Sequence, residues 1–533
     1  MAGTYEQDGD AAGTFLGHPK GLFILFFVEM WERFSYYGMR GLLIFYLTKH
    51  FLFDREFALG ILGAYVTLVY ITPIIGGALA DRYMGARRAV LLGGILLVIG
   101  HAGMAIEGSP VQQGEQADPL ILNIFYLSLA FIIAGVGFLK ANISTMVGFL
   151  YPKTDGRRDS AFTIFYMGIN LGAFLGSLLC GFLGETFGWA YGFGAAGVGM
   201  LLGLVVFVLG RPQLRGAGEA PDEVKLTSPA FMGLSPQILI YLGTALMILI
   251  AWQLVRYQDT VNILLAITGG VALTFIIAKS VIQLDPHERD RIFAAILLIL
   301  FQIMFWALFE QASSSLNLFT DEHVNRDLFG WEVPASMFQS LNAGFIILFA
   351  PVLAALWVRL SNKGRDPSAG MKFGLGLVQL GLGYVVLAWG AELDNGLVPM
   401  IFIVLIYLLH TTGELCLSPV GLSAMTRLSV PSMVGLMMGT WFLGSAGGNA
   451  LSAIIAQEAA ADGAKGGYVS AYWDMGYYAV GFGLFVMVIS PLITKLMHLD
   501  TLKDDNVGDD LVGQRGVGEP QAGGMHPETR LAE

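Results

Sequence analysis

The chain has 533 residues, of which 55% are hydrophobic and 13% are charged, and its mean hydropathy is +0.65. A soluble protein of this length does not tolerate so apolar a composition, so the chain is predicted to be a polytopic membrane protein. The formal net charge of −11 does not indicate a basic partner or a nucleic acid, because the segments 1–19 and 500–533 together carry −8 of it.

Apolar runs long enough to cross about 30 Å of hydrocarbon begin near residues 20, 57, 88, 120, 160, 189, 235, 260, 291, 335, 372, 397, 432 and 469. These fourteen runs lack the apolar–polar alternation of a membrane barrel, so helices are the expected spanning structure. The short loops on one side of the membrane hold seventeen Lys and Arg residues, and those on the other side hold five. This asymmetry predicts that both termini are cytoplasmic.

The runs divide into two sets of six around a Pro- and Gly-rich linker and an extra pair of helices. Two related bundles around a site at the membrane midplane are typical of transporters. The predicted parts are a cytoplasmic tail (1–19), a six-helix bundle (20–210), a cytoplasmic linker (211–234), two additional helices (235–283), a second six-helix bundle (284–498) and a disordered acidic tail (499–533).

The first span carries unusual charges. If the span is helical, six of its polar residues lie on one face within an arc of roughly 140°. These residues are Glu29, Glu32, Arg33, Tyr36, Tyr37 and Arg40. A charge at bilayer depth costs about 2.5–3.5 kcal/mol even on the lenient insertion scale, so this face is expected to look into protein or a water-filled cavity. A purely structural cluster of ion pairs is the alternative.

The loop after span two reads "GGALADRYMGARR". It resembles the G-x-x-x-D-R-x-x-G-R-[KR] loop of the major facilitator superfamily, with Gly77, Asp81, Arg82, Gly85, Arg87 and Arg88 in the matching positions. An acid and a base at a helix end can pair with a neighbouring helix terminus in one conformation and release it in another, which predicts a gating loop. Ordinary positive charge in a cytoplasmic loop would explain the arginines but not the glycines or Asp81.

Three later spans also contain deep charges, namely Lys140 in span four, Glu310 in span seven and Glu414 in span ten. Span seven has a polar face at helical spacing, formed by Gln302, Trp306, Glu310, Ser313, Ser314 and Asn317. With these, four deep carboxylates stand against three deep cations. The surplus carboxylate must take a proton or find a cation that the substrate brings, which indicates proton coupling.

Two segments give a specific resemblance. "EMWERFSYYG" and "FTIFYMGINLGAFLG" resemble the E-x-x-E-R-F-x-Y-Y-G and F-Y-x-x-I-N-x-G signatures of the proton-dependent oligopeptide transporter family, and the likeness extends over residues 20–498. It implies an all-α membrane protein with the major facilitator fold, two six-helix bundles plus two extra helices. The extra pair and the short loop after Glu392 resemble the bacterial branch of the family.

The resemblance also implies roles for individual residues. The charged residues implied in proton coupling are Glu29, Glu32, Arg33, Lys140 and Glu310. The residues implied to bind substrate are Arg33, Tyr36, Arg40, Tyr70, Lys140, Asn170, Trp306, Glu310, Asn342, Glu414, Trp441 and Ser445. Among these, Glu414 is expected to meet a peptide's amino group, and Arg33 with Lys140 its carboxylate. The span-two histidine of animal members corresponds to Gly63, so its role does not transfer.

The expected function is a proton-coupled symporter that imports di- and tripeptides across the cytoplasmic, inner membrane, with no cofactor and no metal. A carrier of the same fold for another small solute, such as nitrate, an amino acid or a drug, is the alternative. An intramembrane enzyme or receptor is disfavoured, because "HERDR" lacks the second histidine of a zinc motif. No oligomeric state is predicted.

Overall fold

The computed structural model describes residues 14–151, 155, 157–393, 396–430, 433–461 and 463–499. Residues 1–13 of the expected amino-terminal tail, and all but the first residue of the expected tail at 499–533, lie outside the described residues. Within the described residues, fourteen helices have 19 residues or more. The expected all-α membrane fold with fourteen spans is confirmed.

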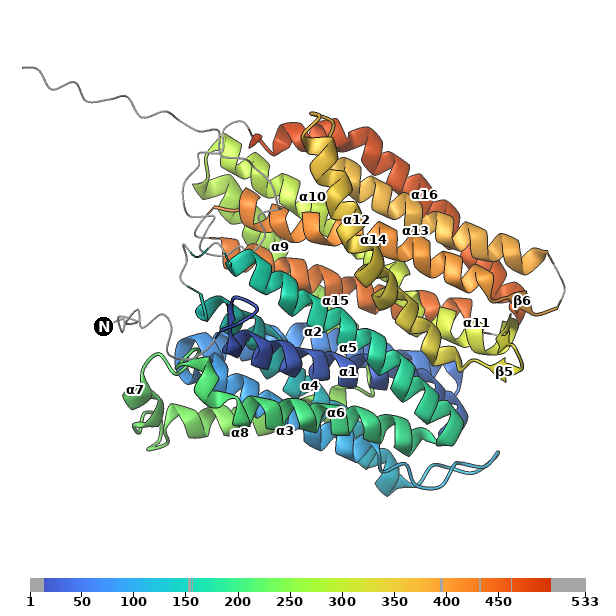
Figure 1. Cartoon of the computed structure of the whole chain (residues 1–533), viewed down its shortest axis with the longest axis horizontal. Coiled ribbons are helices and arrows are strands. Elements are labelled where there is room, and N and C mark those ends of the chain that lie inside the picture. The colour runs from blue at the N-terminus through green and yellow to red at the C-terminus, as the bar shows by residue number, and fades with distance from the viewer. Residues whose placement is uncertain are drawn as a thin grey trace, which may run out of the picture.

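The first six long helices form the amino-terminal bundle, coloured blue to green in Figure 1. They are α1 (Lys20–Phe45), α2 (Arg55–Leu79), α3 (Ala86–Met104), α4 (Pro119–Phe149), α5 (Arg158–Phe187) and α6 (Trp189–Leu209). Single π-helical segments extend two of them, η1 (Tyr46–His50) after α1 and η2 (Ala80–Met84) after α2. Ahead of α1, strand β1 (Thr14–Phe15) pairs antiparallel with β2 (His18–Pro19).

The chain then passes through η3 (Arg211–Leu214) and α7 (Glu223–Thr227) into the long helices α8 (Pro236–Leu254) and α9 (Gln258–Gln283). The carboxy-terminal bundle follows. It consists of α10 (Pro286–Phe309), η4 (Glu310–Ser313), α11 (Ser315–His323), η5 (Ala335–Gln339), α12 (Ser340–Ser361), α13 (Ala369–Glu392), α14 (Ile401–Leu428), α15 (Val434–Ala459) and α16 (Lys465–Leu496). Strand β3 (Val324–Asn325) pairs parallel with β6 (Val398–Pro399), and β4 (Asp327–Leu328) pairs antiparallel with β5 (Trp331–Glu332).

Helix packing joins the two bundles at two places. Within the amino-terminal bundle α1 packs against α5 and α6, and within the carboxy-terminal bundle α13 packs against α14 and α16. Between the bundles α2 packs against α15, and α5 packs against α12. The additional helices rest on this assembly, because α8 contacts α4 while α9 contacts α2, α10 and α15.

Eleven segments of the described chain are long and apolar enough to cross a membrane, and one of them contains both α2 and α3. Helix α1 fails this test because any window of that length across it includes Glu29, Glu32 and Arg33. In Figure 1 the long helices run side by side, with the amino-terminal hairpin and α7 at one end and α11, β5 and β6 at the other. The two ends of this helical body therefore correspond to the two membrane surfaces.

Close contact between α1 and α5 depends on glycine. A Cβ atom built on Gly172 would overlap the backbone carbonyl oxygen of Met30, and one built on Gly176 would overlap that of Phe34. Small residues let two helix backbones approach in this way, as is common between membrane helices. The position of the charged face of α1 is thus fixed by backbone contact with α5.

Gly172→Ala should therefore destabilise the protein. The added methyl group has no room against the rigid backbone of α1, and overpacking of this kind costs about 1–3 kcal/mol. Gly269→Ala on α9 is the matched control, because a Cβ there meets nothing within 4 Å and the helix gains about 0.5–1 kcal/mol. Denaturant unfolding in detergent measures both changes, and equal effects at the two positions would refute this account of the α1–α5 contact.

Candidate functional site

The charged face of α1 lies inside the protein. Glu29, Glu32 and Arg33 are all buried. The Arg33 Nε donates a hydrogen bond of 2.8 Å to Glu29 Oε1 and lies 3.1 Å from Glu32 Oε2. One guanidinium thus faces two carboxyl groups, so acids outnumber bases by one in this part of α1. This local excess is part of the surplus of buried acid expected from the sequence.

Glu32 is the less satisfied of the two carboxylates. Both of its oxygens are buried and accept no hydrogen bond within the described residues. Lys140 of α4, expected to join this cluster, forms no ion pair within the described part of the chain, and its Nζ lies 4.1 Å from the ring centre of Tyr70 on α2. The predicted unit of Glu32, Arg33 and Lys140 therefore stays a prediction. The structure shows Lys140 in a cation–π contact instead.

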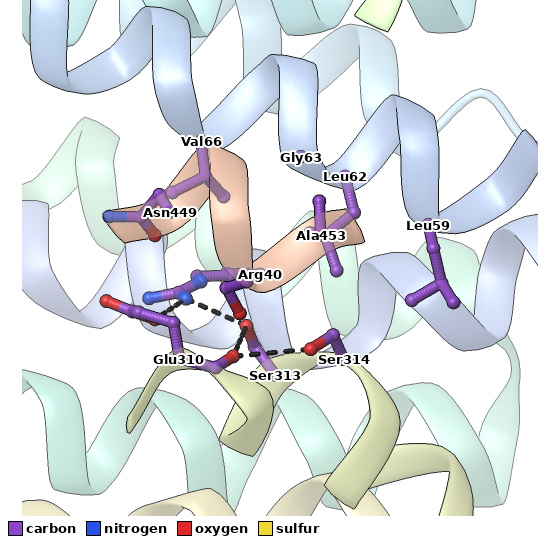
Figure 2. A pocket seen from close by; sticks show the side chains of 11 residues that line it. Arg40, Leu59, Leu62, Gly63, Val66, Glu310, Ser313, Ser314, Asn449 and Ala453 are labelled. Carbon is purple, nitrogen blue, oxygen red and sulfur yellow. Dashed lines mark hydrogen bonds and ion pairs between the residues drawn. The ribbon is translucent and has the colours of Figure 1, made fainter. Parts of the chain in front are cut away.

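A buried ion pair connects the two bundles. Arg40 on α1 donates to the Glu310 carboxylate and, over 2.7 Å, to the Ser313 hydroxyl. Both charged side chains are buried. Figure 2 shows Arg40 and Glu310 pointing toward one another beneath Val66 and Asn449. Because the partners belong to different bundles, this pair holds the bundles together through the membrane interior.

A hollow of about 10 Å³ adjoins this ion pair, and that is close to the smallest space that holds one water molecule. It lies among residues of α1, α2, η4 and α15, with Gly63, Leu62 and Ala453 on the side away from the charges. A Cβ on Gly63 would overlap that of Ala453. Position 63 thus has no room for a larger side chain in this conformation.

The polar face expected along span seven is interrupted. Helix α10 ends at Phe309, the turn η4 follows, and Ser314 has φ −122° and ψ −106° before α11 begins. The hydroxyls of Ser313 and Ser314 donate to the Glu310 carbonyl oxygen at 3.3 and 3.4 Å. Serine side chains that bond to the backbone compete with regular helix. The expectation of one regular helical face is corrected accordingly, and Glu310 lies at the break.

The part of this face before the break points at α15. Gln302 donates to the Trp441 carbonyl oxygen at 2.7 Å, and the indole nitrogen of Trp306 donates to Gln302 Oε1 at 3.2 Å. Beyond the break, Asn317 donates to the carbonyl oxygen of Gly41 at 3.0 Å, across the two bundles. Residues predicted as one stripe therefore have different partners.

Glu414 lies apart from the α1 charges, on α14. Its Oε2 accepts a hydrogen bond of 2.9 Å from Asn342 on α12, and the same amide lies 3.0 Å from the Thr411 hydroxyl. No cation pairs with Glu414 among the described residues. His410, one turn earlier, is buried with its ring 4.9 Å from that of Tyr384 on α13, so it packs between helices. Glu414 is thus a partly buried acid that is free to meet a cation.

The other residues expected in the pocket are placed as follows: Tyr36 on α1 is buried with its hydroxyl unbonded within the described residues, Asn170 on α5 donates to the Tyr166 carbonyl oxygen, and Ser445 on α15 donates to the Trp441 carbonyl oxygen. The candidate site is thus built from α1, α2, α4 and α5 of one bundle and α10, α12, α14 and α15 of the other. Within the described residues, no group of three or more His, Cys, Asp and Glu side chains is arranged to hold a metal.

Sequence reasoning missed the contacts that close one end of the molecule. Arg55 at the start of α2 pairs with Glu322 of α11 at 2.8 Å and donates to the Tyr468 hydroxyl at 2.8 Å. Lys49 pairs with Asp321 at 2.6 Å. The only available signal was that Lys49 and Arg55 are rare cations in the predicted outer loops. These pairs join the bundles at the end that carries α11.

The predicted gating loop has other partners at the opposite end. Gly85 adopts φ 77°, a conformation that favours glycine. Arg87 pairs with Glu219 at 2.8 Å and Arg88 pairs with Glu223 at 2.6 Å, so the linker 211–234 holds both arginines. Asp81 is exposed and forms no ion pair within the described residues. In this conformation the loop binds the linker.

Comparisons with known proteins agree with this architecture. A sequence model of the POT family matches residues 87–468. The peptide transporter YePEPT of Yersinia enterocolitica is 36% identical over 84% of this chain and 89% of its own length. The crystal structure of the peptide transporter POT in complex with sulfate has a TM-score of 0.79 and 38% identity, covering 91% of this chain and 97% of that one. A POT family transporter in complex with 5-aminolevulinic acid has a TM-score of 0.77 and 33% identity, covering 91% and 98%.

The ion pair between the bundles yields a stability prediction. Arg40→Ala leaves the Glu310 carboxylate buried without its cation, which should cost about 3–5 kcal/mol. Adding Glu310→Gln to Arg40→Ala should recover part of this loss, because the remaining side chain is neutral. Denaturant unfolding of the single and double variants in detergent measures the coupling. Arg427→Ala, which removes an exposed arginine, is the control, and strictly additive effects of the Arg40 and Glu310 changes would contradict a direct pair.

Proposed function

The chain belongs to the POT family, and we propose that it is a proton-coupled symporter that imports di- and tripeptides by alternating access. The observation that carries the proposal is the buried Arg40–Glu310 pair between the bundles. A carboxylate that takes up a proton loses its attraction for arginine, so protonation weakens one contact that holds the bundles together. A proton and a change of conformation are thus connected through one side chain.

The surplus of buried acid supports the same mechanism. Within the described residues, Glu29 and Glu32 both pair with Arg33, and Glu414 accepts a hydrogen bond from the Asn342 amide but pairs with no cation. Unpaired acids in the membrane interior are costly, and they mark proton relays and substrate sites. We assign Glu29, Glu32, Arg33, Lys140 and Glu310 to proton coupling. Four of them, Glu29, Glu32, Arg33 and Glu310, are charged groups buried inside the helical body, and the resemblance to the family implies the same role for Lys140.

A peptide would be held by its two charged ends. We propose that Glu414 meets the ammonium group. Lys140 would meet the carboxylate together with Arg33, which also pairs with Glu29 and Glu32. These groups come from opposite bundles, so a bound peptide attracts the bundles to one another and favours closure. An extended chain of two or three residues spans at most about 7–11 Å, comparable with the diameter of one helix, which limits the cargo to short peptides.

The proposed orientation places the termini, the gating loop and the linker at the cytoplasmic face of the inner membrane. The Arg55–Glu322 and Lys49–Asp321 pairs are then on the outside, and the described conformation is closed toward the outside. One proton that crosses about 100 mV supplies about 2.3 kcal/mol, and one pH unit adds about 1.4 kcal/mol. A neutral peptide can therefore be concentrated roughly several hundredfold without a nucleotide.

Uptake of a labelled dipeptide into proteoliposomes with an imposed proton gradient tests the proposal. The parent protein should accumulate dipeptide, and unlabelled nitrate, amino acids or 5-aminolevulinic acid should compete poorly. Glu310→Gln should abolish accumulation, because the side chain no longer exchanges a proton.

Counterflow exchange of peptide should persist in the Glu310→Gln variant, since exchange needs no net proton movement, and this residual activity is the control for folding. Accumulation by the variant with the parent's pH dependence would show that Glu310 is not the coupling group. Preferential competition by one of the other solutes in the parent would identify a carrier of the same fold with different cargo.

The assignment of the peptide ends makes a separate prediction. Acetylating the amino group of a dipeptide removes its positive charge, so it should weaken binding to the parent far more than binding to Glu414→Ala. Amidating the carboxylate should likewise weaken binding to the parent far more than binding to Arg33→Ala. Thermal shift with each ligand measures binding where transport is lost. Equal losses from acetylation in the parent and in Glu414→Ala would refute the assignment of Glu414.

A further inference from the structure

An apolar crevice of about 400 Å³ lies at the cytoplasmic end of the amino-terminal bundle, a volume within the range of about 300–1,000 Å³ usual for small-molecule sites. Its walls come from β1, α1, α5 and η3. It is lined by Phe15, Lys20, Phe23, Ile24, Phe26, Phe27, Ile164, Met167 and Gln213. Seven of these nine residues are apolar, and the two polar ones are Lys20 and Gln213.

The crevice opens away from the transport site. Along α1, residues 20, 23, 24 and 27 follow helical spacing and form one stripe, on the opposite side of the helix from Glu32 and Arg33. Phe27 is 44% exposed and Met167 is 51% exposed. In Figure 1, α1 lies on the near surface between α5 and α6. The stripe therefore faces the surroundings of the protein, which for a spanning helix is the bilayer.

One end of the crevice is polar and lies at the membrane surface. Lys20 is exposed, and its ammonium forms no ion pair within the described residues. The hairpin β1–β2 folds over this end, with Phe15 edge-on to Phe23 at 4.8 Å between ring centres. The hairpin is fixed by a hydrogen bond of 2.8 Å between His18 and Tyr151.

A second cation stands beside this end. Arg157 Nη1 donates to the Gly17 carbonyl oxygen at 2.8 Å, although Asp155 partly neutralises its charge. The crevice thus has Lys20 at its surface end, with Arg157 beside that end, and its apolar part runs from there into the membrane. Long basic side chains at helix ends characteristically reach the headgroup region in this way.

We propose that this crevice binds an anionic phospholipid of the cytoplasmic leaflet, with one acyl chain between α1 and α5 and its phosphate against Lys20. The apolar lining matches an acyl chain, and the unpaired ammonium matches the charge of the headgroup. A peptide or a free phosphate would leave the apolar walls unfilled. The proposal depends on the membrane-spanning fold, and the choice of leaflet rests on the proposed orientation; it is independent of the cargo of the transporter.

Native mass spectrometry of the full-length protein in detergent tests the site, with phosphatidylglycerol and phosphatidylcholine of identical acyl chains as probes. The parent should retain phosphatidylglycerol in preference. Lys20→Gln should weaken phosphatidylglycerol binding about fivefold, the change expected for one basic residue at an anionic surface, with little effect on phosphatidylcholine. Lys495→Gln, an exposed lysine at the end of α16, should leave both unchanged.

A second variant tests the acyl-chain slot. Met167→Trp fills the crevice from a half-exposed position and should reduce retention of both lipids, while a melting temperature equal to that of the parent confirms folding. Addition of inorganic phosphate should not displace phosphatidylglycerol from the parent. Equal effects of Lys20→Gln and Lys495→Gln would overturn the headgroup contact, and full retention of both lipids by Met167→Trp would overturn the slot.

Discussion

The structure depends on the cost of placing charge inside a membrane. Each charged side chain on α1 would be unfavourable against lipid by about 2.5–3.5 kcal/mol or more, so α1 must turn that face inward, where protein groups can pair with the charges. Arg33 serves two carboxylates on its own helix, whereas Arg40 reaches across to Glu310 of the other bundle. The first arrangement fixes one helix, and the second fixes the relation between bundles.

These charges can act together because the helices that carry them are held by backbone contact. Gly172 and Gly176 bring α5 directly against the backbone of α1, so the two helices are expected to move as one body. The contact between the bundles is different in kind, since helix packing there is accompanied by ion pairs at Glu310, Asp321 and Glu322. Contacts of this kind can be exchanged for others when a proton or a ligand changes the charge.

Local sequence patterns predicted the features that depend on local physics. Hydropathy identified the fourteen spans, and helical spacing placed Glu29, Glu32 and Arg33 on one buried face. The turn at Glu310 was missed because a regular period was assumed through three consecutive serines, whose hydroxyls bond to the backbone. The partners of Lys140 and Arg55 were not predictable, because Tyr70 and Glu322 meet them only through the packing of distant helices.

The ion pairs between the linker and the loop after α2 affect how the protein changes between conformations. Arg87 and Arg88 are bound by Glu219 and Glu223, and an arginine that already has a carboxylate partner is less available to another. The hydrogen bond from Arg88 lowers the pKa of Glu223, so this partner stays ionised when the surrounding solution becomes more acidic. The linker therefore competes with any other acidic partner for the arginines of the loop. Its ion pairs with them weaken as mobile ions screen exposed charges. The ionic strength of the solution on that side of the membrane would then help to set how readily this end of the molecule closes.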